Sequence, residues 1–190
     1  MKATFLVTLL GLLYAAGSLP GALQPRLFGE WLRKFPRSGL WGNLLMPAGT
    51  LWFLWLLNQD TVSDFAAIKP LLLAGFAIVG FGACFFVRDF LAVRGLAVVS
   101  LLVAHSVLNA IRWLDTEWRL AVTVWMYLIV VGAVWITISP WRLRDYIAWW
   151  TKEEKRLRLG CAIRVGFGLF VAVLGMTAIR AAELANRALP

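Results

Sequence analysis

The sequence predicts an all-α polytopic membrane protein, a helical bundle of six transmembrane helices arranged as three hairpins. Hydrophobic residues make up 61% of the 190 residues and charged residues only 15%, which is more apolar surface than a water-soluble globule of this length can hide. The apolar residues gather in six runs long enough to span a bilayer, and basic residues gather in alternate connections between the runs. We expect residues 1–190 to form a single integral membrane domain.

The six apolar runs define the predicted spans, since about 20 such residues in a helix cross the hydrocarbon core. They cover residues 3–23, 39–58, 67–87, 91–112, 118–139 and 159–181. Residues 1–23 also resemble a signal peptide, with Lys2, then an apolar core and then small residues. We favour an uncleaved first helix, because cleavage would leave the basic connection 26–37 outside the cell.

Pro25 and Pro140 each open an amphipathic segment, one between the first two spans and one between the last two. Proline suits a helix start because its missing N–H would be unpaired there. Apolar side chains recur at helical spacing in both segments: Leu27, Phe28, Trp31, Leu32 and Phe35 in the first, and Leu143, Tyr146, Ile147 and Trp150 in the second. We therefore expect two short amphipathic helices in the membrane interface. Their shared pattern fits either duplication or convergence on the same hairpin rules.

The distribution of basic residues predicts the topology. Twelve Lys and Arg residues fall in or beside the connections after the first, third and fifth spans, with Arg164 just inside the sixth span on the same side, and six fall on the opposite side. The positive-inside rule then predicts a bacterial inner-membrane protein with these connections in the cytoplasm and both termini in the periplasm. The net charge of +9 indicates binding to membrane lipids and not to nucleic acid. The residues expected to contact lipid headgroups are Arg33, Lys34, Arg37, Lys152, Lys155, Arg156 and Arg158.

Small residues and deep tryptophans predict how the helices pack. Small residues let membrane helices approach closely, and they share one helix face at Ala77, Gly80 and Cys84 and again at Gly168, Ala172 and Gly175. These faces are expected to be contact seams, within the bundle or with a partner. Four tryptophans lie away from the predicted helix ends: Trp52, Trp55, Trp125 and Trp135. Lipid contact or core packing is favoured for them over contact with a bound pigment or quinone.

One polar stripe stands out, on the predicted span 91–112. At 100° per residue, Arg94, His105, Asn109 and Arg112 fall on one helix face, flanked by Ser106. Polar groups in hydrocarbon are costly, so the stripe is expected to face protein or water and the helix to be central. The structural interpretation is hydrogen bonding to neighbouring helices, with the arginines reaching the headgroups. The functional interpretation is a ligand, proton or headgroup site at His105.

Several chemistries lack the residues they need. There is one histidine in the chain, so one chain cannot supply bis-histidine haem ligation. Cys84 and Cys161 are far apart and have no neighbouring histidine, and all acidic residues lie at predicted helix ends or in loops. No catalytic or metal-binding residues are predicted, and a non-enzyme is favoured. No cofactor is predicted, although a haem or chlorophyll-type pigment bound through His105 remains an alternative.

A resemblance rests on residues 88–119. The turn RDFLAVRGLA is followed by Asn109, by Ile111-Arg112-Trp113, by Asp115 and Glu117, and by Trp118-Arg119. In this order the motifs resemble a family of uncharacterised bacterial six-helix inner-membrane proteins of unknown function. The end hairpins, with a Pro-basic start and a basic-Gly return, are similar to a small two-helix membrane family whose function is also unknown. The resemblance implies a polytopic membrane fold and no particular activity.

Three classes of function remain after these exclusions. The favoured class is a non-catalytic membrane subunit, scaffold or assembly factor that binds other membrane protein subunits or further copies of itself. The second is a small transporter or channel that uses the polar stripe, although an embedded acid and a broken mid-membrane helix are missing. The third is a pigment-binding or redox subunit that uses His105.

Overall fold

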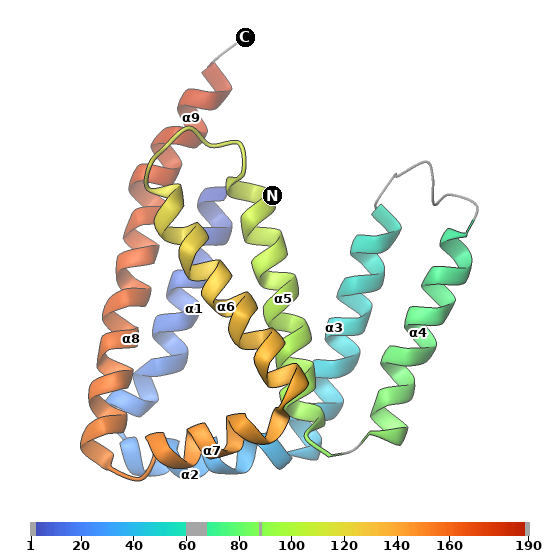
Figure 1. The fold of residues 1–190 in the computed structure, drawn as a ribbon. Coiled ribbons are helices and arrows are strands. Elements are labelled where there is room, and N and C mark those ends of the chain that lie inside the picture. The colour runs from blue at the N-terminus through green and yellow to red at the C-terminus, as the bar shows by residue number, and fades with distance from the viewer. Residues whose placement is uncertain (1–2, 60–67, 88, 189–190) are drawn as a thin grey trace. The chain divides into compact units, whose positions relative to one another are not determined.

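The computed structural model describes residues 3–59, 68–87 and 89–188, which form helices and turns and contain no strand (Figure 1). The chain is therefore all-α over the described residues, as the sequence predicts. The α-helices are α1 (Ala3–Leu23), α2 (Pro25–Lys34), α3 (Gly39–Gln59), α4 (Lys69–Phe86), α5 (Leu91–Ile111), α6 (Arg119–Ile138), α7 (Pro140–Trp150), α8 (Glu154–Leu174) and α9 (Arg180–Ala188). A 3₁₀ turn (Phe35–Arg37) follows α2, and a π-helix (Gly175–Ile179) joins α8 to α9.

Within the described residues, six helical segments are long and apolar enough to cross a membrane. Five of them are α1, α3, α4, α5 and α6, and the sixth runs through α8 into α9 over Glu154–Asn186. The chain is thus a multi-pass membrane protein, as its composition predicts. The sixth segment has 33 residues, about 50 Å of helix, and so it exceeds the ~30 Å hydrocarbon core.

Five predicted spans match the observed helices to within two residues at each end. The sixth predicted span, 159–181, lies within the segment Glu154–Asn186, whose helix begins five residues before the predicted span, at Glu154. Its first turn is too polar to register as a membrane span, yet it contains no helix breaker, and Glu154 lies where the helix dipole favours a negative charge. The predicted short helices begin at Pro25 and Pro140. Lys2 and Arg88, which count toward the topology, lie outside the described residues.

The chain divides into two compact units, and each is described by itself. The first unit comprises Met1–Arg33, Ala104–Val130 and Tyr146–Pro190. It contains α1, most of α2, the end of α5, the first half of α6, the end of α7, and all of α8 and α9. The second unit comprises Lys34–Val103 and Val131–Asp145.

An antiparallel pair of helices, α1 and α8, forms the centre of the first unit. A Cβ added at Gly11 would lie 2.6 Å from the backbone nitrogen of Ala172, and one at Gly168 would lie 2.7 Å from the backbone nitrogen of Ala15. Gly175 similarly faces Thr8. The two backbones are therefore in direct contact along one seam, as small residues allow. The predicted face Gly168, Ala172 and Gly175 is this seam, and its partner is α1.

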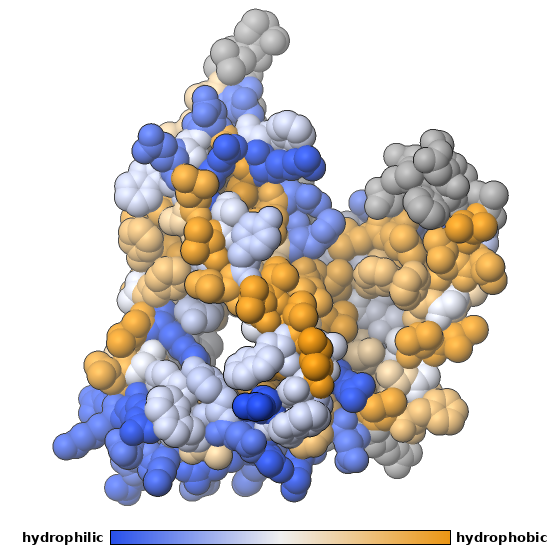
Figure 2. Space-filling model, viewed as in Figure 1, coloured by the Kyte–Doolittle hydropathy of each residue, from blue (hydrophilic) through white to orange (hydrophobic). Residues whose placement is uncertain are grey.

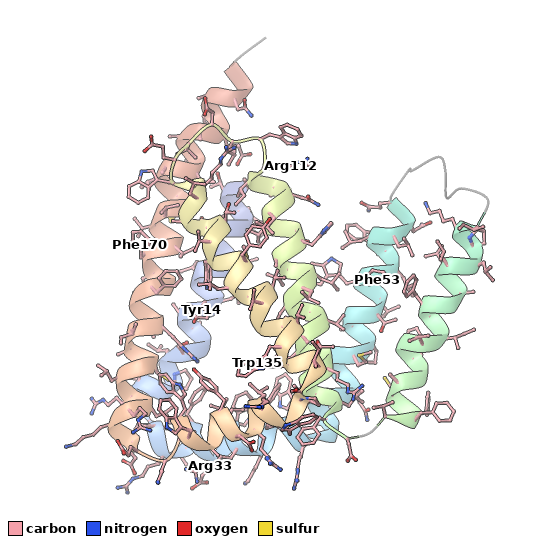
Figure 3. The ribbon with its side chains drawn as sticks, in the orientation of Figure 1. Tyr14, Arg33, Phe53, Arg112, Trp135 and Phe170 are labelled. Atoms are coloured by element: carbon pink, nitrogen blue, oxygen red, sulfur yellow. The ribbon has the colours of Figure 1, made fainter. Side chains whose placement is uncertain are left out.

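An aromatic cluster packs beside the seam in the first unit. The ring of Trp125 lies edge-on to Tyr14 at 5.2 Å and to Phe167 at 5.1 Å between centroids. Trp125 is only 7% exposed, so it is a core residue, one of the two favoured interpretations. The labelled Tyr14 of α1 and Phe170 of α8 are shown in Figure 3.

Polar contacts close the end of the first unit that holds α9. The carboxylate of Glu183 accepts hydrogen bonds from the backbone N–H of Thr4, at 3.1 Å, and from its hydroxyl, at 2.8 Å. This satisfies one of the N–H groups that the first turn of α1 leaves without a helical partner. The amide of Asn186 donates to the carbonyl of Trp113, just beyond α5. The segment 180–186, which follows α8, is thus hydrogen-bonded to the start of α1 and to the residues just after α5.

The second unit is built around α3. Gly42 and Gly49 of α3 face Leu91 and Val98 of α5, and these two helices run parallel. The predicted small-residue face of α4 also packs within this unit, since Gly80 lies against Thr50 of α3. In the same helix pair, the ring of Phe53 packs edge-on against that of Phe76, with 5.0 Å between the ring centroids (Figure 3). Gly80 is the only buried residue of α4, and its other residues are exposed or half-buried.

Candidate functional site

The first candidate site lies at the end of the first unit where α2 meets the α7–α8 junction. We call it the platform, and it consists of the second half of α2, the end of α7 at Trp149 and Trp150, the turn at Thr151, and the first turns of α8. Gly29 of α2 is buried, and a Cβ there would lie 3.4 Å from Leu157 and 3.7 Å from Thr151. This small residue brings α2 against the turn that joins α7 to α8. Figure 2 shows hydrophilic side chains gathered at this end of the unit.

Two arginines of α2 fasten the platform. The Nε of Arg33 donates to the hydroxyl of Thr151 at 2.7 Å, and its Nη2 donates to the carbonyl of the same residue. Because Thr151 directly follows α7, Arg33 satisfies a carbonyl at the end of that helix and complements its dipole. Arg26 forms an ion pair with Glu154 in the first turn of α8. Figure 3 shows Arg33 at the opposite end of the unit from Arg112.

The aromatic part of the platform is the pair Trp149–Trp150, whose rings lie 6.4 Å apart. Trp150 lies directly on the backbone of α8, where a Cβ at Gly160 would overlap its six-membered ring. The guanidinium of Arg156 lies 4.4 Å from the ring centroid of Trp149, and that of Arg164 lies 5.2 Å from the ring centroid of Trp150. These are cation–π distances. Two arginines of α8 therefore flank the aromatic end of α7.

The residues predicted to contact headgroups fall into three groups. Lys152, Lys155 and Arg158 are exposed in the first unit and have no ion pair among the described residues. Arg33 and Arg156 have partners, since Arg156 donates to the Glu153 carboxylate at 3.2 Å and to the Trp149 carbonyl at 3.3 Å. Lys34 and Arg37 are exposed in the second unit. Headgroup contact by the seven residues remains a prediction.

The second candidate site is the polar stripe of α5. The structure brings two of its members together: the amide nitrogen of Asn109 lies 3.0 Å from Nε2 of His105. An amide nitrogen has no lone pair, so it donates and Nε2 accepts. Both side chains are exposed. The first unit by itself therefore leaves the pair uncovered, and the expectation that the stripe faces protein or water stays a prediction.

The other members of the stripe do not join this pair. Arg112 is exposed and lies over Trp113, with the guanidinium 4.9 Å from the ring centroid. Ser106 is half-buried. Arg94 is in the second unit, and its buried Nε has no hydrogen-bond partner among the described residues. The stripe is thus a His–Asn pair with separate arginines and not one assembled site.

Sequence reasoning missed the cluster of Arg164, Trp150 and Gly160. The basic Arg164 lies inside a predicted span, and only the packing of α7 on α8 brings an indole to it. Two signals in the sequence could have indicated this cluster. One is the adjacent pair Trp149 and Trp150 directly before a basic stretch, and the other is Gly160, ten residues after Trp150.

Among the residues that the structure describes, no group of three or more His, Cys, Asp or Glu side chains could hold a metal ion. The two cysteines are free thiols, Cys161 buried and Cys84 half-buried. Comparison with protein-family models, with curated proteins and with solved structures finds no match to this chain.

Proposed function

We propose that this chain is a non-catalytic integral membrane subunit that assembles with further copies of itself and serves as a scaffold in the membrane. The observation that carries the proposal is the exposed His105–Asn109 pair on a helix that is long and apolar enough to cross the bilayer. Polar side chains facing hydrocarbon are costly. A protein surface that pairs with them removes that cost.

The chemistry of the pair favours a second copy as the partner. With Nε2 of His105 accepting from Asn109, the neutral imidazole carries its proton on Nδ1 and the amide oxygen keeps its lone pairs. Each copy therefore offers one donor and one acceptor, four residues apart. Two copies related by a two-fold axis would present these groups in opposite order, as a self-complementary interface requires.

Native mass spectrometry in mild detergent and in lipid nanodiscs tests this proposal. The wild-type chain is expected as an oligomer, and the double variant His105→Leu/Asn109→Leu is expected to dissociate. Interhelical hydrogen bonds in membranes average about 0.6 kcal/mol and reach about 1.7 kcal/mol. Losing two reciprocal bonds should therefore weaken a dimer about tenfold or more.

The matched control is Thr177→Val. Thr177 is exposed on the sixth membrane-crossing segment, but its hydroxyl donates to the Val173 carbonyl of its own helix at 2.8 Å. Removing this hydroxyl should leave the oligomer intact. A wild-type chain that stays monomeric in nanodiscs, or a double variant that keeps the wild-type oligomer, would refute the proposal. A visible absorbance band in the purified protein that His105→Leu removes would favour the pigment-binding alternative.

The proposal places the protein in a bacterial inner membrane with the platform in the cytoplasm and both termini in the periplasm. The excess of Lys and Arg in the connections after the first, third and fifth spans supports this orientation. Single cysteines at Lys152 and Glu117, with Cys84 and Cys161 replaced by alanine, test it. A membrane-impermeant maleimide should label the Glu117→Cys chain in intact cells and the Lys152→Cys chain only in inverted vesicles. The opposite pattern would reverse the topology.

A further inference from the structure

Arg164 has no described counter-charge. It is half-buried on α8, ten residues after Glu154, about 15 Å along the helix axis. The ion pairs among the described residues join Arg26 to Glu154, Arg144 to Asp145 and Arg156 to Glu153, and none includes Arg164. No described residue accepts a hydrogen bond from its guanidinium either. A buried or half-buried guanidinium normally has an anion or several acceptors as partners.

The surroundings of Arg164 direct its guanidinium toward the platform. Side chains of an α-helix lean toward its N-terminus, which for α8 is the platform end. The guanidinium reaches the face of Trp150, and Gly160 lets that indole lie directly on the helix backbone. The ring therefore forms one wall beside the guanidinium, and a tryptophan at a helix end is typical of the headgroup level of a membrane.

We propose that Arg164 and Trp150 form a binding site for the phosphodiester of an anionic glycerophospholipid. A guanidinium forms paired hydrogen bonds with phosphate oxygens, and the N–H groups of Arg164 have no other described acceptor. The lipid is anionic because Lys152, Lys155 and Arg158, in the α7–α8 turn and the first turns of α8, are exposed and have no ion pair among the described residues. They attract a net negative headgroup and repel the ammonium of a zwitterionic one.

An apolar lane for the acyl chains continues from this site. Leu159, Ile163 and Phe167 are 65%, 64% and 37% exposed and follow one another at four-residue spacing on α8. They lie on one helix face, next to the face that carries Arg164. An acyl chain on this lane puts the phosphate at Trp150, whereas inorganic phosphate has no such contact. We therefore commit to a lipid as the occupant.

Native mass spectrometry of the full chain in nanodiscs that mix phosphatidylglycerol with phosphatidylethanolamine tests the site. The wild-type chain should retain phosphatidylglycerol on release from the nanodisc. Arg164→Gln should weaken this retention about tenfold or more, as loss of a charge-assisted contact does. Arg180→Gln removes the same charge from an exposed position near the opposite end of the same membrane-crossing segment, and it should weaken retention no more than about twofold.

Thermal unfolding in detergent separates loss of the site from loss of the fold. Wild-type and Arg164→Gln chains should unfold at similar temperatures without lipid, and phosphatidylglycerol should raise the midpoint of the wild-type chain alone. Trp150→Leu should reduce this shift. If Arg164→Gln unfolds at a lower temperature than the wild-type chain without lipid, Arg164→Lys is used in its place. Lysine keeps the charge but lacks the planar guanidinium, so the Arg164→Lys chain should retain lipid less well than the wild-type chain.

Three outcomes would overturn the proposal. One is equal loss of lipid in Arg164→Gln and Arg180→Gln, since net charge and not the Arg164 site would then be responsible. Another is equal retention of phosphatidylglycerol and phosphatidylethanolamine. The third is stabilisation of the wild-type chain by inorganic phosphate alone as large as that by the lipid. The proposal does not depend on oligomerisation, because the lipid site and the His105–Asn109 pair are tested by different variants.

Discussion

Two helix pairs, α1–α8 in the first unit and α3–α4 in the second, are held together in different ways. In the first pair, glycines of α8 lie against backbone atoms of α1, and Glu183 accepts hydrogen bonds from Thr4. In the second pair, Gly80 of α4 lies against the side chain of Thr50, and Phe53 packs edge-on against Phe76. A backbone cannot yield to an added atom, whereas a side chain can rotate. The α1–α8 seam should therefore tolerate far less change than the α3–α4 contact.

The largest effect is expected from Gly11→Ala. The added methyl carbon would lie 2.6 Å from both the nitrogen of Ala172 and the carbonyl oxygen of Gly168. The helices must separate along the seam. The free energy of unfolding should therefore fall by about 3 kcal/mol, the upper end of the usual range for overpacking. Thermal unfolding in detergent, followed by circular dichroism, measures this loss.

Gly17→Ala is the matched control for this change in the same helix. Gly17 is exposed and has no atom within 4 Å of an added Cβ. The free energy of unfolding should therefore rise by about 0.5–1 kcal/mol, because alanine has the higher helix propensity. Equal melting temperatures for the two variants would mean that α1 and α8 are not in backbone contact.

The second prediction concerns Gly80→Ala in the second unit. The new Cβ would overlap the side chain of Thr50, whose hydroxyl donates to the Met46 carbonyl at 2.8 Å. Thr50 must rotate and lose this bond, so a smaller cost of about 1–2 kcal/mol is expected. The double variant Gly80→Ala/Thr50→Ala should recover most of it. Failure of the second substitution to recover stability would place the obstruction in the backbone and remove the difference between the α1–α8 and α3–α4 pairs.

How far the sequence predicts this fold depends on whether a feature is local. The apolar runs and the starts at Pro25 and Pro140 are local, and the observed helices follow them. The Gly168–Gly175 face is also visible in the sequence. Its partner Gly11 is not, because pairing joins residues distant along the chain. The π-helix at Gly175 has no recognisable pattern, since its wider hydrogen bonding depends on packing.

The candidate sites show the same division. His105 and Asn109 are four residues apart, so their contact is predictable from helical spacing. Their exposure depends on which other helices pack beside α5, which the stripe itself does not indicate. The Arg164–Trp150 contact needs the indole of α7 to lie on Gly160 of α8. No periodicity within a single helix contains that information.

The third prediction tests the polar closure of the first unit through Glu183→Gln. The carboxylate accepts from the N–H and hydroxyl of Thr4 at the positive end of α1, and an uncharged amide is a weaker acceptor there. A loss of about 1 kcal/mol is expected from the charge-assisted bond and the helix dipole. Glu117→Gln removes an exposed acid with no ion pair among the described residues and should change stability little. If both variants lose the same amount, net charge and not the contact with Thr4 is responsible.

The smallest effect is expected where the first unit uses surface charge, in Arg26→Gln. The side chains of Arg26 and Glu154 are 81% and 53% exposed, so water and salt screen their attraction, and the pair should contribute about 0.5 kcal/mol or less. Arg33→Gln is the informative neighbour, because Arg33 donates to both the hydroxyl and the carbonyl of Thr151 and its loss should cost about 1 kcal/mol. When unfolding is measured at low and at high salt, only the stability difference between the wild-type chain and Arg26→Gln should depend on the salt concentration. An Arg26 variant as unstable as the Arg33 variant, with the same salt dependence, would show that α2 is held to α8 by charge and not by the Gly29 contact and the Thr151 hydrogen bonds.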